Sequence, residues 1–346
     1  MRCASSESIT VGMGKTPTNV SNRTMAPRSA PLALPRPLQR RLETGLAQLL
    51  QPHGNRGDDF LGPPGEAALS APDSICWRVF KNPLALFVGG VTAVVLELAE
   101  PRVRSGVWQH TSFREQPLER MRRTAHAAMV TVYGPRSRAE AMIAGVSRMH
   151  GRVRGVTPEG ISFCASDPEL LDWVHATASF GFLEAYVNYV RPLTALQRDQ
   201  FYAEGLPAAN LYGATSAPGS ESALHEMFDR IAGQLQSSQI VFEFLRIMRR
   251  MPALPALLRP LQGVLINAAV QIIPMPLRRR LDLGEDWNLP AWQRRLVCRL
   301  GDAADRLILR THPAVQASRR LGLPDDYLYE QDERRRSEAG MKNAHR

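Results

Sequence analysis

The sequence predicts an all-α fold organised as a single large helical domain. Between residues 80 and 325 the apolar residues recur with a helical period. The strand signature, in which Val, Ile and Thr alternate with polar residues between Asn-Gly or Asp-Gly turns, is nearly absent. No segment repeats at a fixed period, which argues against a solenoid. A chain of 346 residues, 44% of them hydrophobic, can bury a sizeable core and is not wholly disordered.

The composition divides the chain into three parts. Residues 1–40 are rich in Ser, Thr, Pro and Gly and are predicted to be a disordered N-terminal tail, within which Met25 is a candidate start. Residues 41–328 are predicted to form the helical domain, and residues 329–346 a charged C-terminal tail. The opening residues lack the apolar run of a secretory signal.

Two segments, 86–96 and 261–277, are the most apolar in the chain. Each is shorter than the ~20 residues that a membrane-spanning helix needs, and Glu97 or prolines bound them. We predict that both are buried core helices, with shallow membrane contact as the alternative.

Two helices in the first half of the domain can be placed from their boundaries. One is predicted to begin at Pro117 and to end at Gly134, before Pro135. Its apolar face carries Met121, Thr124, Ala125, Ala128 and Val132. The second is predicted to begin at Ser137, in a capping box with Glu140, and to run toward Gly155. Its apolar stripe carries Ile143, Val146, His150 and Val153.

Two further helices follow. The first has Asp167 as its cap and Pro168 in its first turn, and it continues to Arg191. The second is predicted to run from Thr194 to Gly205. We expect no catalytic role for Ser137 or Asp167, because capping explains both.

The charge of the chain is strongly basic and almost entirely due to arginine. There are 43 Lys and Arg residues against 33 Asp and Glu, a formal net charge of +10, and only Lys15, Lys81 and Lys342 are lysines. Such a balance suits nucleic acid, an anionic membrane surface or anionic groups held inside the protein. The four cysteines lie far apart without a C-x-x-C pair, which favours a reducing, cytoplasmic location with peripheral membrane association as an alternative.

Several motifs of common enzyme classes are missing. The sequence has no G-x-G-x-x-G, phosphate-binding loop, G-x-S-x-G elbow or H-E-x-x-H pair. No basic cluster is interleaved with aromatic residues, so we expect no nucleic-acid partner, and a basic DNA-associated protein is only a minor alternative.

Histidine and arginine spacing suggests one kind of site. His150 and His175 lie on apolar helical stripes, whereas His126 falls off the stripe of its helix. A lone histidine in such a place is commonly a core residue bonded to a backbone carbonyl. Arg154 follows His150 by four residues, which predicts that both lie on one helix.

Arg120 and Thr124 are also four residues apart and should share a helix face. A neutral imidazole with arginines nearby is suited to a haem, because imidazole binds iron and guanidinium groups pair with propionates. A solvated helix face explains the same arginines without a cofactor.

Ordered blocks of the chain resemble a known family. They include VSRMHGRVRG and the long run DPELLDWVHATASFGFLEAYVNYVRPLTALQRDQFYAE, within residues 78–285. These blocks are similar to the haem oxygenases that include the latex clearing protein (rubber oxygenase) and the endoplasmic-reticulum oxygenase of mycophenolic acid biosynthesis. The resemblance implies an all-α fold with a haem pocket between core helices.

The resemblance also implies roles for particular residues. His150 corresponds to the proximal iron ligand, and Arg120 and Thr124 match the family's Arg-x-x-x-Thr element on the oxygen side. Arg154 would lie near a propionate. His175 would lie near the pocket, as a structural or supporting residue first and a ligand second.

The chain departs from this pattern at three positions. Arg123 stands where rubber-cleaving members have a lysine before the threonine, and a guanidinium is a poor metal ligand, which argues against polyisoprene as substrate. Glu97 and Glu100 stand where many relatives have Gln and His. A carboxylate there would be a pocket base or the partner of a nearby arginine.

The leading hypothesis is a haem b-dependent oxygenase in which Arg120 and Thr124 are catalytic and His150 holds the iron. Its substrates would be dioxygen and a hydrophobic compound, terpenoid or otherwise unsaturated, with oxidative C=C cleavage as the reaction. The alternative is a non-catalytic haem- or lipid-binding helical protein at a membrane surface.

Overall fold

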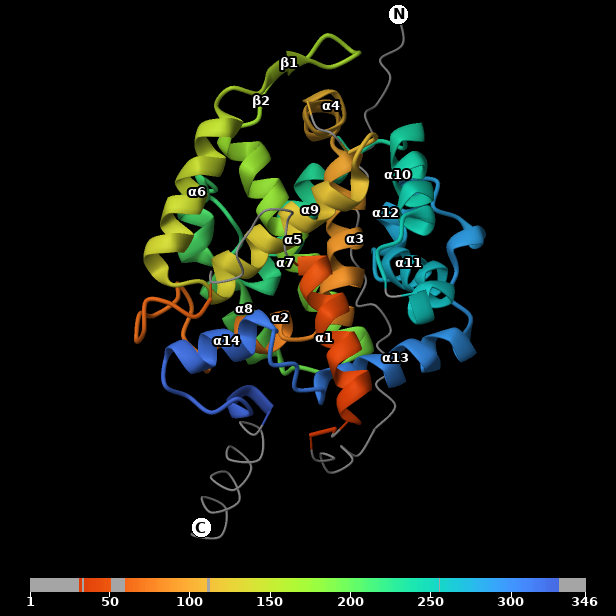
Figure 1. Ribbon diagram of the computed structural model, residues 1–346. Helices are drawn as coiled ribbons and strands as arrows, with labels where there is room; N and C mark the ends of the chain where they lie inside the picture. Colours follow the sequence, from red (N-terminus) through yellow and green to blue (C-terminus); the bar gives the residue numbers. More distant parts are fainter. Residues whose placement is uncertain (1–30, 33, 51–59, 111–112, 255, 330–346) are drawn as a thin grey trace, which may run out of the picture.

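The all-α prediction is confirmed by the computed structural model, which describes residues 31–329 apart from 33, 51–59, 111–112 and 255 (Figure 1). The first helices are α1 Arg36–Leu50, α2 Ile75–Phe80, α3 Pro83–Ala99, α4 Pro101–His110, α5 Pro117–Tyr133 and α6 Arg136–His150. A short antiparallel hairpin follows, β1 Arg154–Val156 and β2 Ser162–Cys164. The middle of the chain forms α7 Pro168–Tyr189, α8 Ala195–Tyr212, α9 Glu221–Ala232 and α10 Gln239–Arg250. The last elements are η1 Ala256–Leu261, α11 Gln262–Gln271, α12 Met275–Arg280, η2 Glu285–Trp287, α13 Ala291–Asp305 and α14 Pro313–Arg320.

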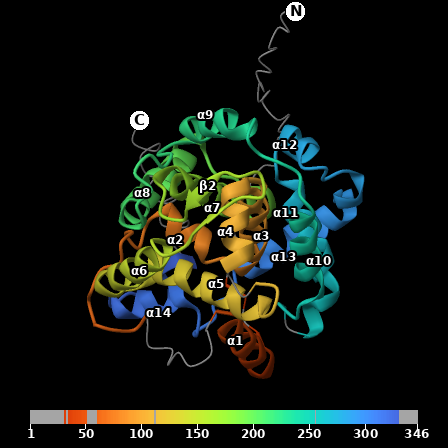
Figure 2. The ribbon, with the colours of Figure 1, turned by 90° about the horizontal axis from the view of Figure 1, so that it is seen from above.

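The core is built around α3 and α7, which pack along one another. Seen from above, these helices and α4 lie in the middle, with α5, α6 and α8 on one side and α10, α11 and α12 on the other (Figure 2). The two apolar helices can approach closely because Gly89 of α3 faces Gly181 of α7. A Cβ atom on Gly181 would lie 2.4 Å from the carbonyl oxygen of Gly89. Thr92 then joins α3 to α11 through a 2.8 Å hydrogen bond from its hydroxyl to the carbonyl of Ala269.

Local sequence explains where α3 begins. The side chain of Asn82 accepts hydrogen bonds from the backbone N–H groups of Leu84 and Ala85, and Pro83 occupies the first helical position. The same amide donates to the carbonyl oxygen of Gly301 at 3.0 Å, which attaches the cap to α13.

Both apolar segments form helices of the core. Segment 86–96 lies within α3, and segment 261–277 comprises α11 and the start of α12, as the absence of long apolar runs suggested. Among the described residues no single helix is long and apolar enough to span a membrane. Helix α3 and the part of α4 from Pro101 to Gln109 are together long and apolar enough, but the two helices are bent by 109° relative to each other.

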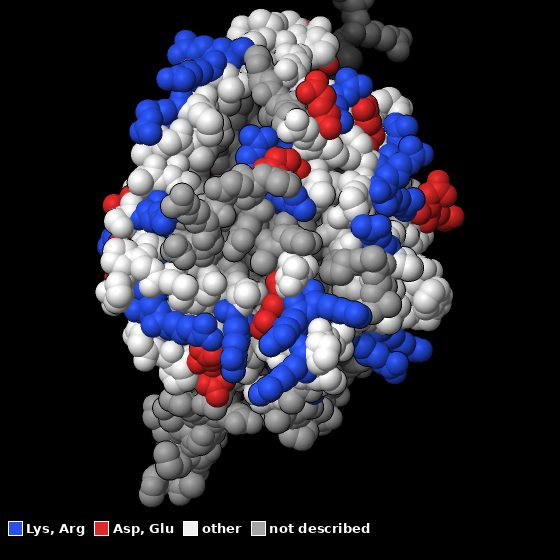
Figure 3. Space-filling model, in the orientation of Figure 1, with Lys and Arg blue, Asp and Glu red and all other residues white. Residues whose placement is uncertain are grey.

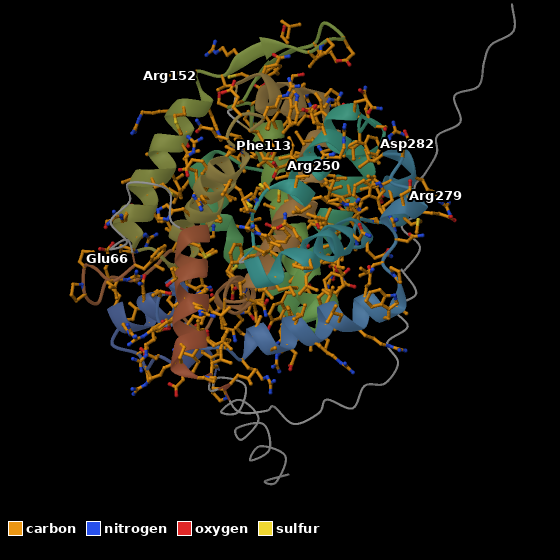
Figure 4. The ribbon with its side chains drawn as sticks, turned by 45° about the vertical axis from the view of Figure 1, so that its right-hand side comes forward. Glu66, Phe113, Arg152, Arg250, Arg279 and Asp282 are labelled. Carbon is orange, nitrogen blue, oxygen red and sulfur yellow. The ribbon has the colours of Figure 1, made fainter. Side chains whose placement is uncertain are left out.

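The helix that carries His150 differs from its prediction at both ends. It ends at His150 rather than near Gly155, because Gly151 follows and the chain turns into the β1–β2 hairpin. Its N-cap residue is Pro135, and Ser137 does not cap it. Instead the backbone N–H and hydroxyl of Ser137 donate to the carboxylate of Glu66, labelled in Figure 4.

Two other boundaries also differ, and one predicted cap lacks its side-chain bond. The fourth predicted helix continues past Gly205 to Tyr212, where Gly213 ends it with a φ of 93°. Asp167 is the N-cap residue of α7 and Pro168 lies in its first turn, as predicted, but the carboxylate of Asp167 accepts from the N–H of Cys164 and makes no cap bond to the helix. Helix α1 begins at Arg36, inside the predicted N-terminal tail, so helical structure starts before residue 41. Of the predicted tails, 1–40 and 329–346, residues 1–30 and 330–346 lie outside the described residues.

Candidate active site

The ends of α3 and α6 and the start of α5 lie in the upper part of the molecule (Figure 1), and each carries a titratable side chain. Glu97 lies near the end of α3, Arg120 in the first turn of α5, and His150 at the last position of α6. The charge of Arg120 acts on both of the others, since it lowers the pKa of His150 and opposes the rise in the pKa of Glu97. The fold thus places Arg120 within electrostatic reach of two residues, Glu97 and His150, that are 53 positions apart in the chain.

Arg120 is held by its own helix. Its guanidinium donates to the hydroxyl of Thr124, and that hydroxyl lies 3.0 Å from the carbonyl oxygen of Arg120. The four-residue spacing predicted that the two residues share a helix face, and this contact lies on that face. Burial lowers the pKa of Arg120, the charge of Glu97 opposes that change, and the nearby charge of Arg123 adds to it. An arginine remains protonated under these conditions, so Arg120 is a fixed cation at the site.

His150 presents a ring nitrogen that the described protein does not satisfy. Its Nδ1 is buried and has no hydrogen-bond partner among the described residues, and the same is true of the hydroxyl oxygen of Ser147, three residues earlier on α6. Residues with this spacing share a helix face. Burial, followed by the charge of Arg120, lowers the pKa of His150, so its imidazole is neutral at pH 7. From the sequence, Ser147 was not singled out as a site residue. Its spacing of three residues from His150 was the one sequence signal that could have marked it.

For each of Glu97 and Glu100 the sequence left two roles open, a pocket base or an ion pair with arginine, and the structure distinguishes the two residues. Glu100 is buried and pairs with Arg102 at 2.7 Å, while it also accepts a hydrogen bond from the backbone N–H of Val103. Burial raises the pKa of Glu97 to about 7. Arg120 acts on Glu97 through its charge, without an ion pair within the described residues.

Arg154 is not on the helix of His150, and this part of the prediction is wrong. It lies exposed on β1, opposite Cys164 in the hairpin, and its charge lowers the pKa of that thiol after the hydrogen bonds from Ser166. The helical spacing did not apply because Gly151 ends α6. No described contact joins Arg154 to His150 or Arg120.

His175 lies on α7, where it faces α8. Its Nε2 is 3.4 Å from the hydroxyl of Ser179, and a Cβ atom on Gly205 would lie 3.4 Å from the same nitrogen. Burial lowers the pKa of His175 to about 4. These contacts favour the structural role that was placed first for this residue.

The donors at the site suit a haem. Within the described residues no group of three or more His, Cys, Asp or Glu side chains could hold a metal ion. A haem does not need such a group, because the porphyrin supplies the in-plane nitrogens and one neutral imidazole can complete the attachment. His150, with its buried and unsatisfied nitrogen, fits that requirement.

The fold and the site define a helical protein with a histidine, an arginine and a carboxylate brought together from three core helices. The family model for the catalytic domain of the ER-bound oxygenases mpaB/B′ and rubber oxygenase matches residues 77–306. The chain therefore belongs to this family, and it is an oxygenase. Rubber oxygenases of the family use haem-type cofactors. No curated protein and no solved structure matches the chain.

Proposed function

We propose that the protein is a haem b-dependent oxygenase that uses dioxygen to cleave a carbon–carbon double bond of a hydrophobic, terpenoid or other unsaturated, substrate. The observation that carries this proposal is the buried Nδ1 atom of His150, which lacks a protein partner and lies within reach of the charge of Arg120. The family membership of the chain supports the same reaction class.

The residues that would hold the cofactor are few. His150 would ligate the iron through its neutral imidazole, and Ser147 offers a hydroxyl on the same helix face. When bound, the haem supplies the activation of dioxygen. We do not assign Arg154 to a propionate, because it lies on the hairpin and acts on Cys164.

Arg120 would be the main catalytic group of the protein chain. Its guanidinium is a fixed cation whose orientation is set by Thr124, so it can stabilise negative charge as oxygen is reduced. Met121 and Ala125 directly follow these two residues on α5 and are half-buried, so each polar side chain has an apolar neighbour on the helix. This combination suits an apolar substrate beside a charged oxygen site.

Glu97 would hold a proton close to Arg120. A carboxyl group with a pKa of about 7 is partly protonated at neutral pH and can give or accept a proton without a large energetic cost. This corresponds to the base that was one of the two alternatives for the position.

Oxygen uptake by the haem-loaded protein tests this proposal. With unsaturated terpenoids as substrates, Arg120→Ala should retain the Soret band but slow oxygen uptake by about 100-fold, the usual cost of removing one stabilising donor. Arg136→Ala is the control, since Arg136 is exposed and pairs with Glu140 at the start of α6. Unchanged uptake in Arg120→Ala would remove this residue from catalysis. A haem-loaded wild-type protein that consumes no oxygen with any of the substrates would instead favour the non-catalytic haem-binding alternative.

A further inference from the structure

The β1–β2 hairpin and the end of α6 expose apolar side chains beside the candidate site. Met149 is 58% exposed, Val156 54% and Ile161 51%. These are three of the nine large hydrophobic side chains that are exposed in the described part of the chain, and they fall within 13 residues. This concentration distinguishes the hairpin from surfaces where such residues occur singly.

The exposure follows from how the hairpin packs. Its inner face is anchored by Phe163, which is buried against α4, where a Cβ atom on Gly106 would lie 3.3 Å from the Phe163 ring. Its outer face presents Arg154 and Val156 to solvent. The N–H of Thr157 donates to the carbonyl of Ile161 at 2.8 Å, which closes the turn between the two apolar residues. The tip is therefore a hydrogen-bonded turn with apolar side chains on either side.

Basic side chains surround this tip. Arg148, Arg152 and Arg154 are exposed, and none of them forms an ion pair with another described residue. Between residues 148 and 164 the only acidic residue is Glu159. In Figure 3 basic side chains gather at the upper left, next to the uncharged apex formed by the hairpin. Figure 4 shows Arg152 at the edge of the molecule beside the end of α6.

We propose that the hairpin tip and the end of α6 dock onto an anionic lipid bilayer. In this arrangement Val156, Ile161 and Met149 would enter the boundary between headgroups and acyl chains, and the arginines behind them would contact lipid phosphates. The charge is complementary to an anionic surface. The absence of aromatic side chains between residues 148 and 162 argues against a nucleic acid, which such a tip would otherwise bind by stacking.

The place of the tip in the fold gives the docking a functional meaning. His150 is the next residue after Met149, so the docked face would bring the end of α6 close to the bilayer. If the protein has the proposed function, on which this role of the docking rests, a hydrophobic substrate dissolved in the membrane would reach the site without crossing water.

Vesicle co-sedimentation of the full chain tests the proposal. We expect binding to vesicles of phosphatidylcholine with 30 mol% phosphatidylserine, and binding at least about tenfold weaker to phosphatidylcholine alone or in high salt. The double variant Val156→Ser/Ile161→Ser should bind about tenfold more weakly, and Arg152→Gln about fivefold more weakly. Leu196→Ser is the matched control, because Leu196 is 78% exposed at the start of α8, away from the hairpin.

Each outcome supports or contradicts the proposal that the hairpin tip docks onto an anionic bilayer. Binding by the double variant equal to that of wild type would overturn the proposal, as would equal binding to neutral and anionic vesicles. Concentration-dependent self-association that the double variant abolishes, without vesicle binding, would make the tip an interface between two copies instead. The Soret band of the double variant should be that of wild type, so a failure of docking and a failure of the proposed haem site give different results.

Discussion

Glu97 and Glu100 lie three residues apart at the end of α3 and yet have different electrostatic environments. The carboxylate of Glu100 pairs with Arg102 and accepts a hydrogen bond from the N–H of Val103 in the first turn of α4, so its negative charge is compensated. Glu97 is half-buried, and the charge of Arg120 on α5 lowers its pKa by less than burial raises it. The sequence left base and ion pair open for both residues, because the choice depends on which helix packs over each carboxylate.

The raised pKa of Glu97 has a consequence for stability. In the unfolded chain this group ionises near its ordinary pKa of 4.5, whereas the fold keeps it protonated up to about pH 7. The unfolded state therefore binds fewer protons across this window, and stability falls as the pH rises from 4.5 to 7. Glu97→Gln removes the effect, so the variant should gain about 1–3 kcal/mol over wild type at pH 7 and little at pH 4.5.

Urea unfolding at several pH values measures this difference. Glu140→Gln is the control, since Glu140 is exposed and its pairing with Arg136 contributes little. A stability difference between Glu97→Gln and wild type that stays constant with pH would show that the carboxyl of Glu97 ionises normally.

A spacing of four residues predicted a shared helix face correctly only where a single helix carries both residues. Arg120 and Thr124 were predicted to share a helix face because the Pro117 boundary placed both on α5, and in the structure they are hydrogen-bonded. The same rule failed for Arg154, since the helix that would have carried it ends at His150. Ser147 gave no signal of its own, because a serine becomes notable only when the structure shows its hydroxyl buried without a partner.

At the scale of elements, the crossing of α3 and α7 depends on two glycines. A Cβ atom on Gly89 would lie 2.7 Å from the carbonyl oxygen of Gly181, and backbone cannot move away as a flexible side chain can. The neighbouring Gly90 is different, since its Cβ would meet the ring of Phe182 at 3.9 Å, an ordinary contact. These adjacent positions form a matched pair in the same helix.

Gly89→Ala should destabilise the protein by about 1–3 kcal/mol through overpacking. Gly90→Ala should be neutral or stabilise by up to about 1 kcal/mol, because alanine favours a helix interior. Thermal unfolding of the two variants checks the prediction. Equal melting temperatures for both would mean that α3 and α7 are not in close backbone contact.

The elements that the sequence predicted best have strong local boundaries. Helices α5 and α7 begin at prolines, and their predicted starts are those of the structure. The end of α8 was missed because Gly205 and Pro207 normally interrupt a helix, whereas here the helix continues, with Gly205 against His175. The hairpin was missed because its strands are only three residues long, which is too short for an alternating pattern.

At the scale of the whole molecule, a buried ionic cluster joins parts of the chain that are distant in sequence. Lys81, just before α3, lies 3.2 Å from the carboxylate of Asp305 at the end of α13. Arg191, just after α7, pairs with the same carboxylate at 2.8 Å. These charges lower the pKa of Asp305 against the effect of burial. The pairing explains one of the three lysines of the chain, which composition alone could not place.

The excess of basic residues in the chain is divided between arginines inside the fold and arginines at the surface. Arg120 and Arg191 are examples of arginines used inside the fold, whereas Figure 3 shows many basic side chains at the surface. The all-α class followed from helical periodicity throughout the domain. The meeting of Glu97, Arg120 and His150 did not, because it depends on the packing of three helices.

The central claim is that His150 is the protein ligand of a haem, and the absorption spectrum of a cavity variant tests it most directly. Wild-type protein loaded with haem should show a Soret band, and His150→Gly should lose most of it because the neutral imidazole is gone. Free imidazole at millimolar concentration should restore the band in His150→Gly. His225→Gly, which removes a half-buried histidine of α9, should behave as wild type. Full haem retention in His150→Gly without imidazole would contradict the account.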